Sequence, residues 1–188
     1  MVQSRGLGDV YKRQIYSCSE SNNEYEYIVK DQDFRTEVLI NNSGNYIELE
    51  NGYTYFEEAN QDSVTGTVVL VHGFSVPSYI LETTFNSIKN KGFRVIMMDL
   101  YGRGFSDNPG LPQTDELRAS QVIELLDKRG IEYASFVGLS NGGRIISKIA
   151  YLRPNIVKEL FYIASSGFYE YPDLNDRKLT SRFAVFHQ

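Results

Sequence analysis

The chain has 188 residues, of which 41% are hydrophobic and 23% are charged, the proportions of a globular protein with enough core for one domain. Its net charge of -5, without any basic stripe, argues against nucleic-acid binding, and no apolar run reaches the length of a membrane span. The single cysteine, Cys18, excludes an internal disulfide framework. The two histidines, His72 and His187, are far apart, so we expect neither a metal site nor a cofactor.

The first fourteen residues, 1–14, differ from the rest of the chain. They contain three basic residues, Arg5, Lys12 and Arg13, and one acid, Asp9. The string GLGDVYKRQ resembles a translated sequencing or cloning adaptor. We therefore interpret residues 1–14 as a non-native segment and expect the true N-terminus to be missing. A natural flexible tail is the alternative interpretation.

Residues 15–18, Ile-Tyr-Ser-Cys, precede a polar run and resemble the end of a bacterial lipoprotein signal. The resemblance implies a lipid on Cys18, a flexible tether over residues 15–35 and a place in the cell envelope. The apolar segment that should come first is absent, and Tyr16 is an unusual residue at its position. The alternative is an ordinary cysteine in a flexible segment, with a cytoplasmic enzyme as the default.

Residues 25–66 are predicted to form β structure. Residues 45–50 and 53–58 alternate between apolar and polar side chains, and the Asn51-Gly52 pair between them is a strong two-residue hairpin signal. The run Thr67–Val71 is instead continuously apolar and β-branched, which is typical of a strand buried on both faces of a parallel sheet.

The remainder of the chain alternates between helix and strand patterns. Thr114 is the expected N-cap of one helix, with acidic residues in its first turn and Gly130 after its end. The predicted fold is α/β, with a mixed and mostly parallel sheet flanked by helices. The expected elements are helices over 79–91, 114–129 and 144–152, and strands over 94–98, 133–137 and 158–164.

Ser140 is the central candidate for chemistry. It lies in Gly138-Leu-Ser-Asn-Gly142-Gly143, between a predicted strand and a predicted helix, and Gly-x-Ser-x-Gly at such a junction is typical of a nucleophile elbow. The flanking Gly138 and Gly142 would let strand and helix approach closely, because a side chain at either position would clash. His72-Gly73-Phe74 and the segment 99–107 end the two preceding strands, where ligands bind in parallel sheets.

These three motifs together, VHGF (71–74), DLYGRGFSD (99–107) and GLSNGG (138–143), make the sequence similar to the α/β-hydrolase superfamily. The likeness is to its esterase and monoacylglycerol-lipase-like branch and covers roughly residues 45–165. It implies that Ser140 is the nucleophile and that the backbone N–H groups of Phe74 and Asn141 form the oxyanion hole. It also implies that His72, Gly73 and Asp99 shape the site without acting as base or acid.

The sequence departs from this family pattern after Ser140. A catalytic serine needs a base and a carboxylate to orient that base, and the family places both downstream. His187, Asp173 and Asp176 are poor candidates because no further strand precedes them. We therefore expect residues 36–166 to be an incomplete hydrolase core, 167–188 to begin a cap, and the chain to be an inactive fragment of an active parent.

The leading functional prediction is hydrolysis of a small carboxylic ester through an acyl-enzyme on Ser140. A serine at this position argues against haloalkane dehalogenase or epoxide hydrolase chemistry, in which an aspartate attacks. Carbon–carbon bond hydrolases, lactonases and aminopeptidases of the same fold remain open. A non-catalytic binding protein is the alternative from another class, although a binding module needs no strained serine.

Overall fold

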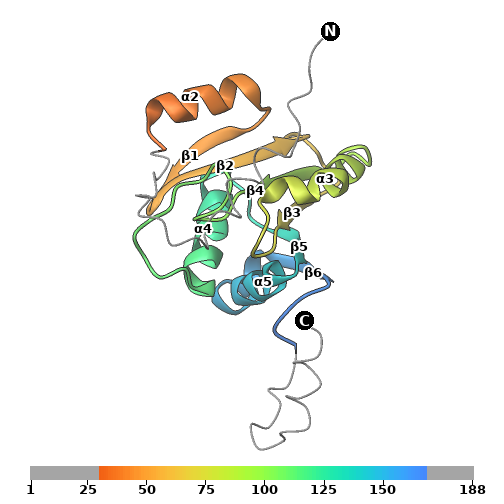
Figure 1. The fold of residues 1–188 in the computed structure, drawn as a ribbon. Coiled ribbons are helices and arrows are strands. Elements are labelled where there is room, and N and C mark those ends of the chain that lie inside the picture. The colour runs from red at the N-terminus through yellow and green to blue at the C-terminus, as the bar shows by residue number, and fades with distance from the viewer. Residues whose placement is uncertain (1–29, 169–188) are drawn as a thin grey trace, which may run out of the picture.

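The computed structural model describes residues 30–168, which form one mixed sheet covered by helices on both faces (Figure 1). Six strands lie in the order β1-β2-β4-β3-β5-β6. β1 and β2 form an antiparallel hairpin, β2 pairs antiparallel with β4, and all later pairs are parallel. This confirms the predicted fold class. The strands are β1 (Asn45–Leu49), β2 (Gly52–Ala59), β3 (Thr67–Val71), β4 (Arg94–Met98), β5 (Ala134–Leu139) and β6 (Val157–Ile163).

The hairpin turn is located where the Asn-Gly pair predicts it. Leu49 pairs with Gly52, and Gly52 has φ 133°, a conformation that a side chain would strain. β3 lies in the middle of the sheet, between β4 and β5, and its residues Val69, Leu70 and Val71 are completely buried. The continuous apolar run in the sequence therefore corresponds to a strand with helices on both faces.

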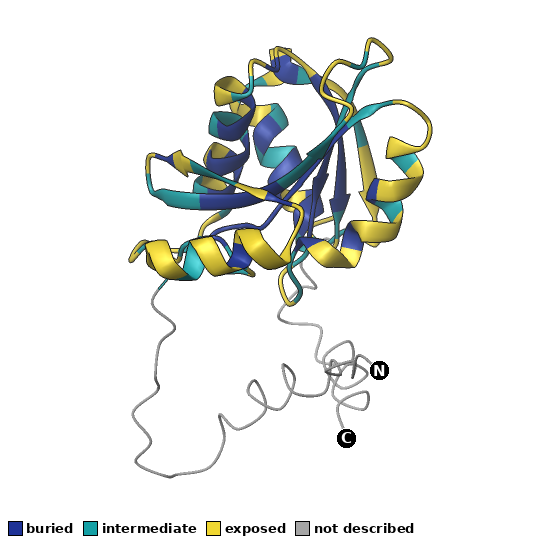
Figure 2. Ribbon diagram, turned by 90° about the horizontal axis from the view of Figure 1, so that it is seen from above, coloured by how far each residue is buried: buried dark blue, intermediate teal, exposed yellow. Residues whose placement is uncertain are grey.

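Three helices cover the two faces of the sheet. α4 (Asp115–Lys128) and α5 (Asn141–Leu152) contribute to the larger apolar cluster, together with Phe136 and Ile96 of the strands. α3 (Glu82–Lys89) contributes Phe85 to a second cluster on the other face. Figure 2 shows buried positions, in dark blue, on the central strands and on parts of the helices. The sheet thereby separates two cores.

Helix α2 (Gln32–Asn41) corrects the prediction that residues 25–66 form only β structure. Its N-cap is Asp31, whose carboxylate accepts a hydrogen bond from the Phe34 N–H at 2.9 Å. The helix also begins inside residues 15–35, which were predicted to be a flexible tether, so the boundary at residue 36 falls within one element. Most of its surface is exposed, and Val38 is its one buried residue.

Two further helix boundaries differ from prediction. The segment 79–91 begins as a 3-10 turn, η2 (Ser78–Leu81), and only then becomes α3. The helix after Ser140 begins at Asn141, three residues earlier than expected, because the turn at Ser140 is a single residue. Thr114 caps α4 as predicted, accepting a hydrogen bond from the Leu117 N–H.

Strand β6 forms one edge of the sheet and carries several exposed apolar side chains. Phe161 is 50% exposed, and Tyr162 and Ile163 are similarly open. Unpaired strand edges of this kind are prone to pair with other chains. None of the helices within residues 30–168 is long and apolar enough to cross a membrane. Cys18, residues 1–14, His187 and the acids Asp173 and Asp176 lie outside the described residues.

Candidate active site

Three loops meet at the carboxyl ends of the central strands. Val71, the last residue of β3, pairs with Met98 of β4 on one side and with Gly138 of β5 on the other. The loops that follow these strands therefore start side by side. They contain the three motifs that the sequence singled out, and Ser140 lies in the loop after β5.

Ser140 lies at the tip of a sharp turn between β5 and α5. Its φ of 53° and ψ of -118° are rare for a residue with a side chain, and the side chain is exposed. Backbone hydrogen bonds hold this conformation: the Ser140 N–H donates to the Ile163 carbonyl at 2.9 Å, and its carbonyl accepts from Gly143 and Ser166 at 3.1 Å. The turn is thus a nucleophile elbow in its geometry.

Gly138 and Gly142 are required by the close approach of strand and helix. A Cβ at Gly138 would lie 2.7 Å from the carbonyl carbon and oxygen of Gly142. A Cβ at Gly142 would collide with the Val71 carbonyl oxygen and lie 2.8 Å from that of His72. Neither contact can relax without moving backbone, so both positions exclude side chains.

The expected oxyanion donors lie beside the serine. A Cβ on Gly73 would be 3.6 Å from the Ser140 hydroxyl oxygen, so the loop after β3 passes directly over the elbow. Asn141 is the first residue of α5, and its N–H therefore has no partner within the helix. Phe74 follows Gly73, and within residues 30–168 its N–H has no backbone partner. Both N–H groups are available to an anion.

His72 is buried and supports the loop backbone. Its Nε2 accepts a hydrogen bond from the Leu100 N–H at 3.0 Å, so Nδ1 carries the proton and donates to the Gly73 carbonyl at 2.7 Å. Burial lowers the pKa of the imidazole and keeps it neutral. Both ring nitrogens are occupied, and the ring links the loop after β3 to the loop after β4.

Asp99 organises the loop after β4. Its Oδ1 accepts hydrogen bonds from the Ser78 N–H and hydroxyl at 2.8 and 2.7 Å, and its Oδ2 accepts one from the Phe105 N–H at 2.8 Å. A side chain on Gly104 would collide with this carboxylate. Asp99 is thus buried, and both of its carboxylate oxygens accept hydrogen bonds from loop residues.

A buried polar network behind Asp99 was not anticipated from the sequence. The Ser106 hydroxyl donates to the Asp99 carbonyl at 2.6 Å and accepts from the Tyr55 N–H at 2.9 Å. Gln121 of α4 accepts from the Tyr101 N–H and donates to Thr54 and to the Asp99 carbonyl. These side chains satisfy backbone groups that the irregular loop leaves unpaired.

Two basic side chains also hold these loops. The Arg103 Nε donates to the Phe74 carbonyl at 2.5 Å, and its guanidinium lies 4.5 Å from the centroid of the Phe74 ring. The Lys30 ammonium donates to the carbonyls of Gly104 and Ser106. Burial lowers the pKa of Lys30. Neither residue stands out in the sequence; the only signal for Arg103 is its place between two motif glycines.

The described residues contain no base positioned for Ser140. His72 is the one histidine within residues 30–168, and its nitrogens are engaged elsewhere. In the same part of the chain, no three His, Cys, Asp or Glu side chains are arranged to hold a metal ion. Within residues 30–168, the arrangement therefore brings together the exposed Ser140 hydroxyl and the two expected oxyanion donors without a base.

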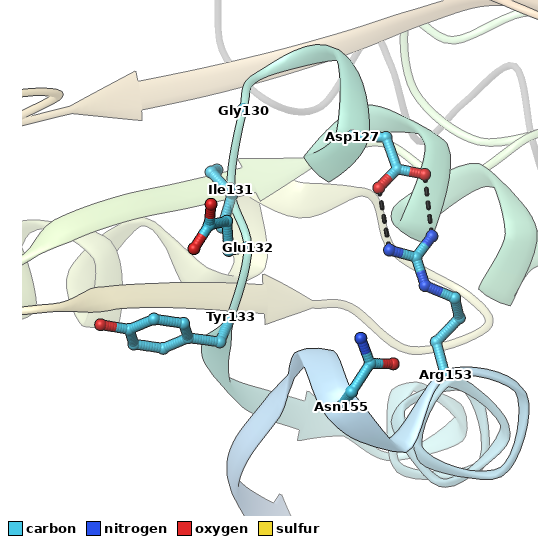
Figure 3. A pocket seen from close by; sticks show the side chains of 7 residues that line it. All are labelled: Asp127, Gly130, Ile131, Glu132, Tyr133, Arg153 and Asn155. Carbon is cyan, nitrogen blue, oxygen red and sulfur yellow. Dashed lines mark hydrogen bonds and ion pairs between the residues drawn. The ribbon is translucent and has the colours of Figure 1, made fainter.

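One pocket lies away from this site. It has a volume of about 570 Å³ and is lined by the turn 130–133, Asp127, Arg153 and Asn155 (Figure 3). Arg153 and Asp127 form a two-fold ion pair across it at 2.9 and 3.0 Å. These residues precede β5 and β6, so the pocket opens at the amino ends of the strands. Ligands of parallel α/β sheets bind at the other end.

Comparison with known proteins identifies partial relatives. The chain is 33% identical over 99 residues to a pimeloyl-[acyl-carrier protein] methyl ester esterase of Aliivibrio fischeri, covering 53% of this chain and 36% of that protein. It is 27% identical over 122 residues to bifunctional epoxide hydrolase 2 of Mus musculus, covering 63% and 22%. The chain thus spans about a third or less of the length of these curated relatives.

The solved structures agree with the observed fold. The structure titled "Est816 as an N-Acyl homoserine lactone degrading enzyme" matches with a TM-score of 0.59 and 25% identity, over 64% of this chain and 45% of that one. A family model described as the alpha/beta hydrolase fold matches residues 66–186, which include all three motif loops. The chain belongs to the alpha/beta hydrolase family.

Proposed function

We propose that the protein containing this chain is a serine hydrolase of carboxylic esters. The Ser140 hydroxyl would give its proton to a base and attack the ester carbonyl carbon. The tetrahedral oxyanion would accept hydrogen bonds from Phe74 and Asn141. The carbon–oxygen bond to the alcohol then breaks, the alcohol leaves with the proton, and water releases the acid from the acyl-enzyme.

The observation that carries this proposal is the conformation of Ser140. A residue with φ 53° and ψ -118° costs of order 1–3 kcal/mol and persists only where its surroundings impose it. Here two side-chain-free glycines and three backbone hydrogen bonds impose it. The result is an exposed hydroxyl beside two N–H groups that have no backbone partner within residues 30–168, an arrangement that supports attack at a carbonyl carbon.

The choice of an ester rests on the nucleophile and on the relatives. An esterase and an N-acyl homoserine lactone degrading enzyme are among the similar proteins, and the substrates in both names contain acyl groups. An epoxide hydrolase is also among them. The candidate nucleophile here is a serine, which favours acyl transfer over chemistry in which an aspartate attacks. A base and its orienting acid would have to come from outside residues 30–168.

A fluorophosphonate probe on the full-length protein tests the proposal. We expect covalent labelling of Ser140, loss of labelling in Ser140→Ala, and hydrolysis of a short acyl ester that disappears in the same variant. A folded full-length protein that neither reacts with the probe nor hydrolyses esters would favour the binding-module alternative. Thermal unfolding of Ser140→Ala serves as the folding control.

A further inference from the structure

The loop that carries Phe74 is held at both ends, and one side-chain hydrogen bond holds its tip. His72 fixes the base through the Leu100 N–H and the Gly73 carbonyl. Ser78, at the other end of the loop, is buried and donates to Asp99, whereas Phe74 and Ser75 are exposed, Phe74 to 61%. Within the described residues, the hydrogen bond that holds the Phe74 peptide is the one from Arg103 at 2.5 Å.

Local hydrogen bonds hold both the backbone and the side chain of Arg103. It stands between Gly102 and Gly104, which have φ of 74° and 47°, and its N–H donates to the Leu100 carbonyl at 2.9 Å. Its Nη1 donates to the Gly102 carbonyl at 2.8 Å. The side chain is therefore directed from the loop after β4 across to the loop after β3. Its positive charge also contributes to the lowered pKa of His72, which agrees with its place between the loops.

We propose that Arg103 is a positioning residue for the oxyanion hole: it clamps the Phe74 peptide and ring so that the Phe74 N–H faces the Ser140 hydroxyl. This inference rests on the proposed function. The guanidinium makes two contacts at once, a hydrogen bond from Nε and a face contact on the aromatic ring at 4.5 Å. A lysine could make only one of them, because its ammonium is a point donor on a flexible stem.

The clamp has a distinct kinetic consequence. The oxyanion forms only in the transition state, so a misplaced donor lowers kcat and leaves substrate binding almost unchanged. Removing an oxyanion donor outright costs about 100- to 1,000-fold in kcat. A donor that remains but is mobile should cost less, about 10- to 50-fold.

The test uses Arg103→Ala, Arg103→Lys and Arg103→Met in the full-length protein, with Arg153→Ala as the matched control. Arg153 forms an exposed ion pair at the opposite end of the strands. We expect the three Arg103 variants to lose about 10- to 50-fold in kcat with KM within about threefold, and the control to keep its activity. Arg103→Met keeps an apolar side chain beside Phe74 but removes the hydrogen bond and the charge over the ring, so its loss reports the guanidinium and not the apolar stem.

Hydrogen exchange gives a readout that does not depend on turnover. In Ser140→Ala, adding Arg103→Met should accelerate exchange of the protected Ser78 N–H, which donates to Asp99 at the end of this loop, and leave β3 unchanged. Unaltered exchange there, full activity of Arg103→Lys, or a loss confined to KM would overturn the clamp. If the wild-type protein shows no ester hydrolysis while exchange responds as expected, the proposed function fails and the clamp stands as a structural feature.

Discussion

The elbow after β5 and the loops after β3 and β4 solve the same problem by different means. At the elbow, Ser140 is held by backbone hydrogen bonds and by the absence of side chains at Gly138 and Gly142. In the other two loops, buried polar side chains do the holding, chiefly His72 and Asp99. The conformation of the elbow therefore depends mainly on close backbone packing, whereas that of the other two loops depends on side-chain hydrogen bonds.

The difference predicts how each part fails. The closely packed elbow should tolerate changes of charge and pH but not an added carbon atom. The loops held by polar side chains should tolerate small changes of volume but not the loss of a hydrogen-bond acceptor or a change of protonation. We therefore compare added side-chain volume with the loss of polar groups, in variants of the 188-residue chain.

The largest effect is expected from Gly142→Ala. The new Cβ would press against the carbonyls of Val71 and His72, and relief requires the helix to move away from β3. We expect a loss of about 3 kcal/mol in the free energy of unfolding. Gly110→Ala is the matched control, because a Cβ there meets nothing within 4 Å, and it should stay within about 0.5 kcal/mol. Urea unfolding measures the free energy of unfolding of both variants. Equal values would contradict the inference that close backbone packing excludes a side chain at Gly142.

Asp99→Ala should be the most damaging polar change. It removes the acceptor of the Ser78 and Phe105 N–H groups, and water can replace only part of it. We expect a loss of about 2 kcal/mol. Asp127→Ala removes a carboxylate from an exposed ion pair and should cost less than about 1 kcal/mol. The same urea measurements apply, and a loss no larger than that of the control would contradict the assigned role.

His72 should make stability depend on pH. Burial lowers its pKa in the folded chain, so the unfolded chain binds a proton more readily. The contribution is fully present above about pH 6.5 and is lost as the pH falls below it. Between pH 7 and 5.5 we expect a loss of about 1 kcal/mol that His72→Gln does not show. Parallel pH profiles of the two proteins would contradict this.

The smallest effect is expected from Lys30→Met. The ammonium holds the carbonyls of Gly104 and Ser106, but its burial costs desolvation energy that offsets much of the gain. We expect a loss of about 0.5 kcal/mol, with faster hydrogen exchange in residues 104–107 as the more sensitive measurement. Exchange in β5 should not respond, and a change there would show that the loops are not independent.

The parts of the fold that the sequence could predict are those governed by local pattern. A few adjacent residues are enough to predict three of them: the strand Thr67–Val71, the Asn51-Gly52 turn and the Thr114 cap. Helix α2 was missed although Asp31 is a standard N-cap residue. It buries only Val38, so it lacks the apolar periodicity that marks a helix.

The candidate site divides in the same way. The Gly-x-Ser-x-Gly pattern identifies Ser140 because the two glycines that the elbow requires lie within two residues of it. The supporting side chains are not predictable locally, because their partners are distant in sequence. Gln121 lies in the middle of α4 and resembles a surface residue, yet it is buried and reaches Thr54, 67 positions away. Only the folded sheet brings such pairs together.

The loop 60–66 has a practical consequence for attaching probes to this protein. It precedes β3 and so lies at the amino ends of the parallel strands. Lys30 and Ser166 lie near the two limits of the described region instead, and they contact the loops of the candidate site directly. Asp62 is exposed in that loop. A fluorophore or surface linker fixed at Asp62 would leave the approach to Ser140 open, while a bulky tag joined close to Lys30 or Phe168 would crowd it.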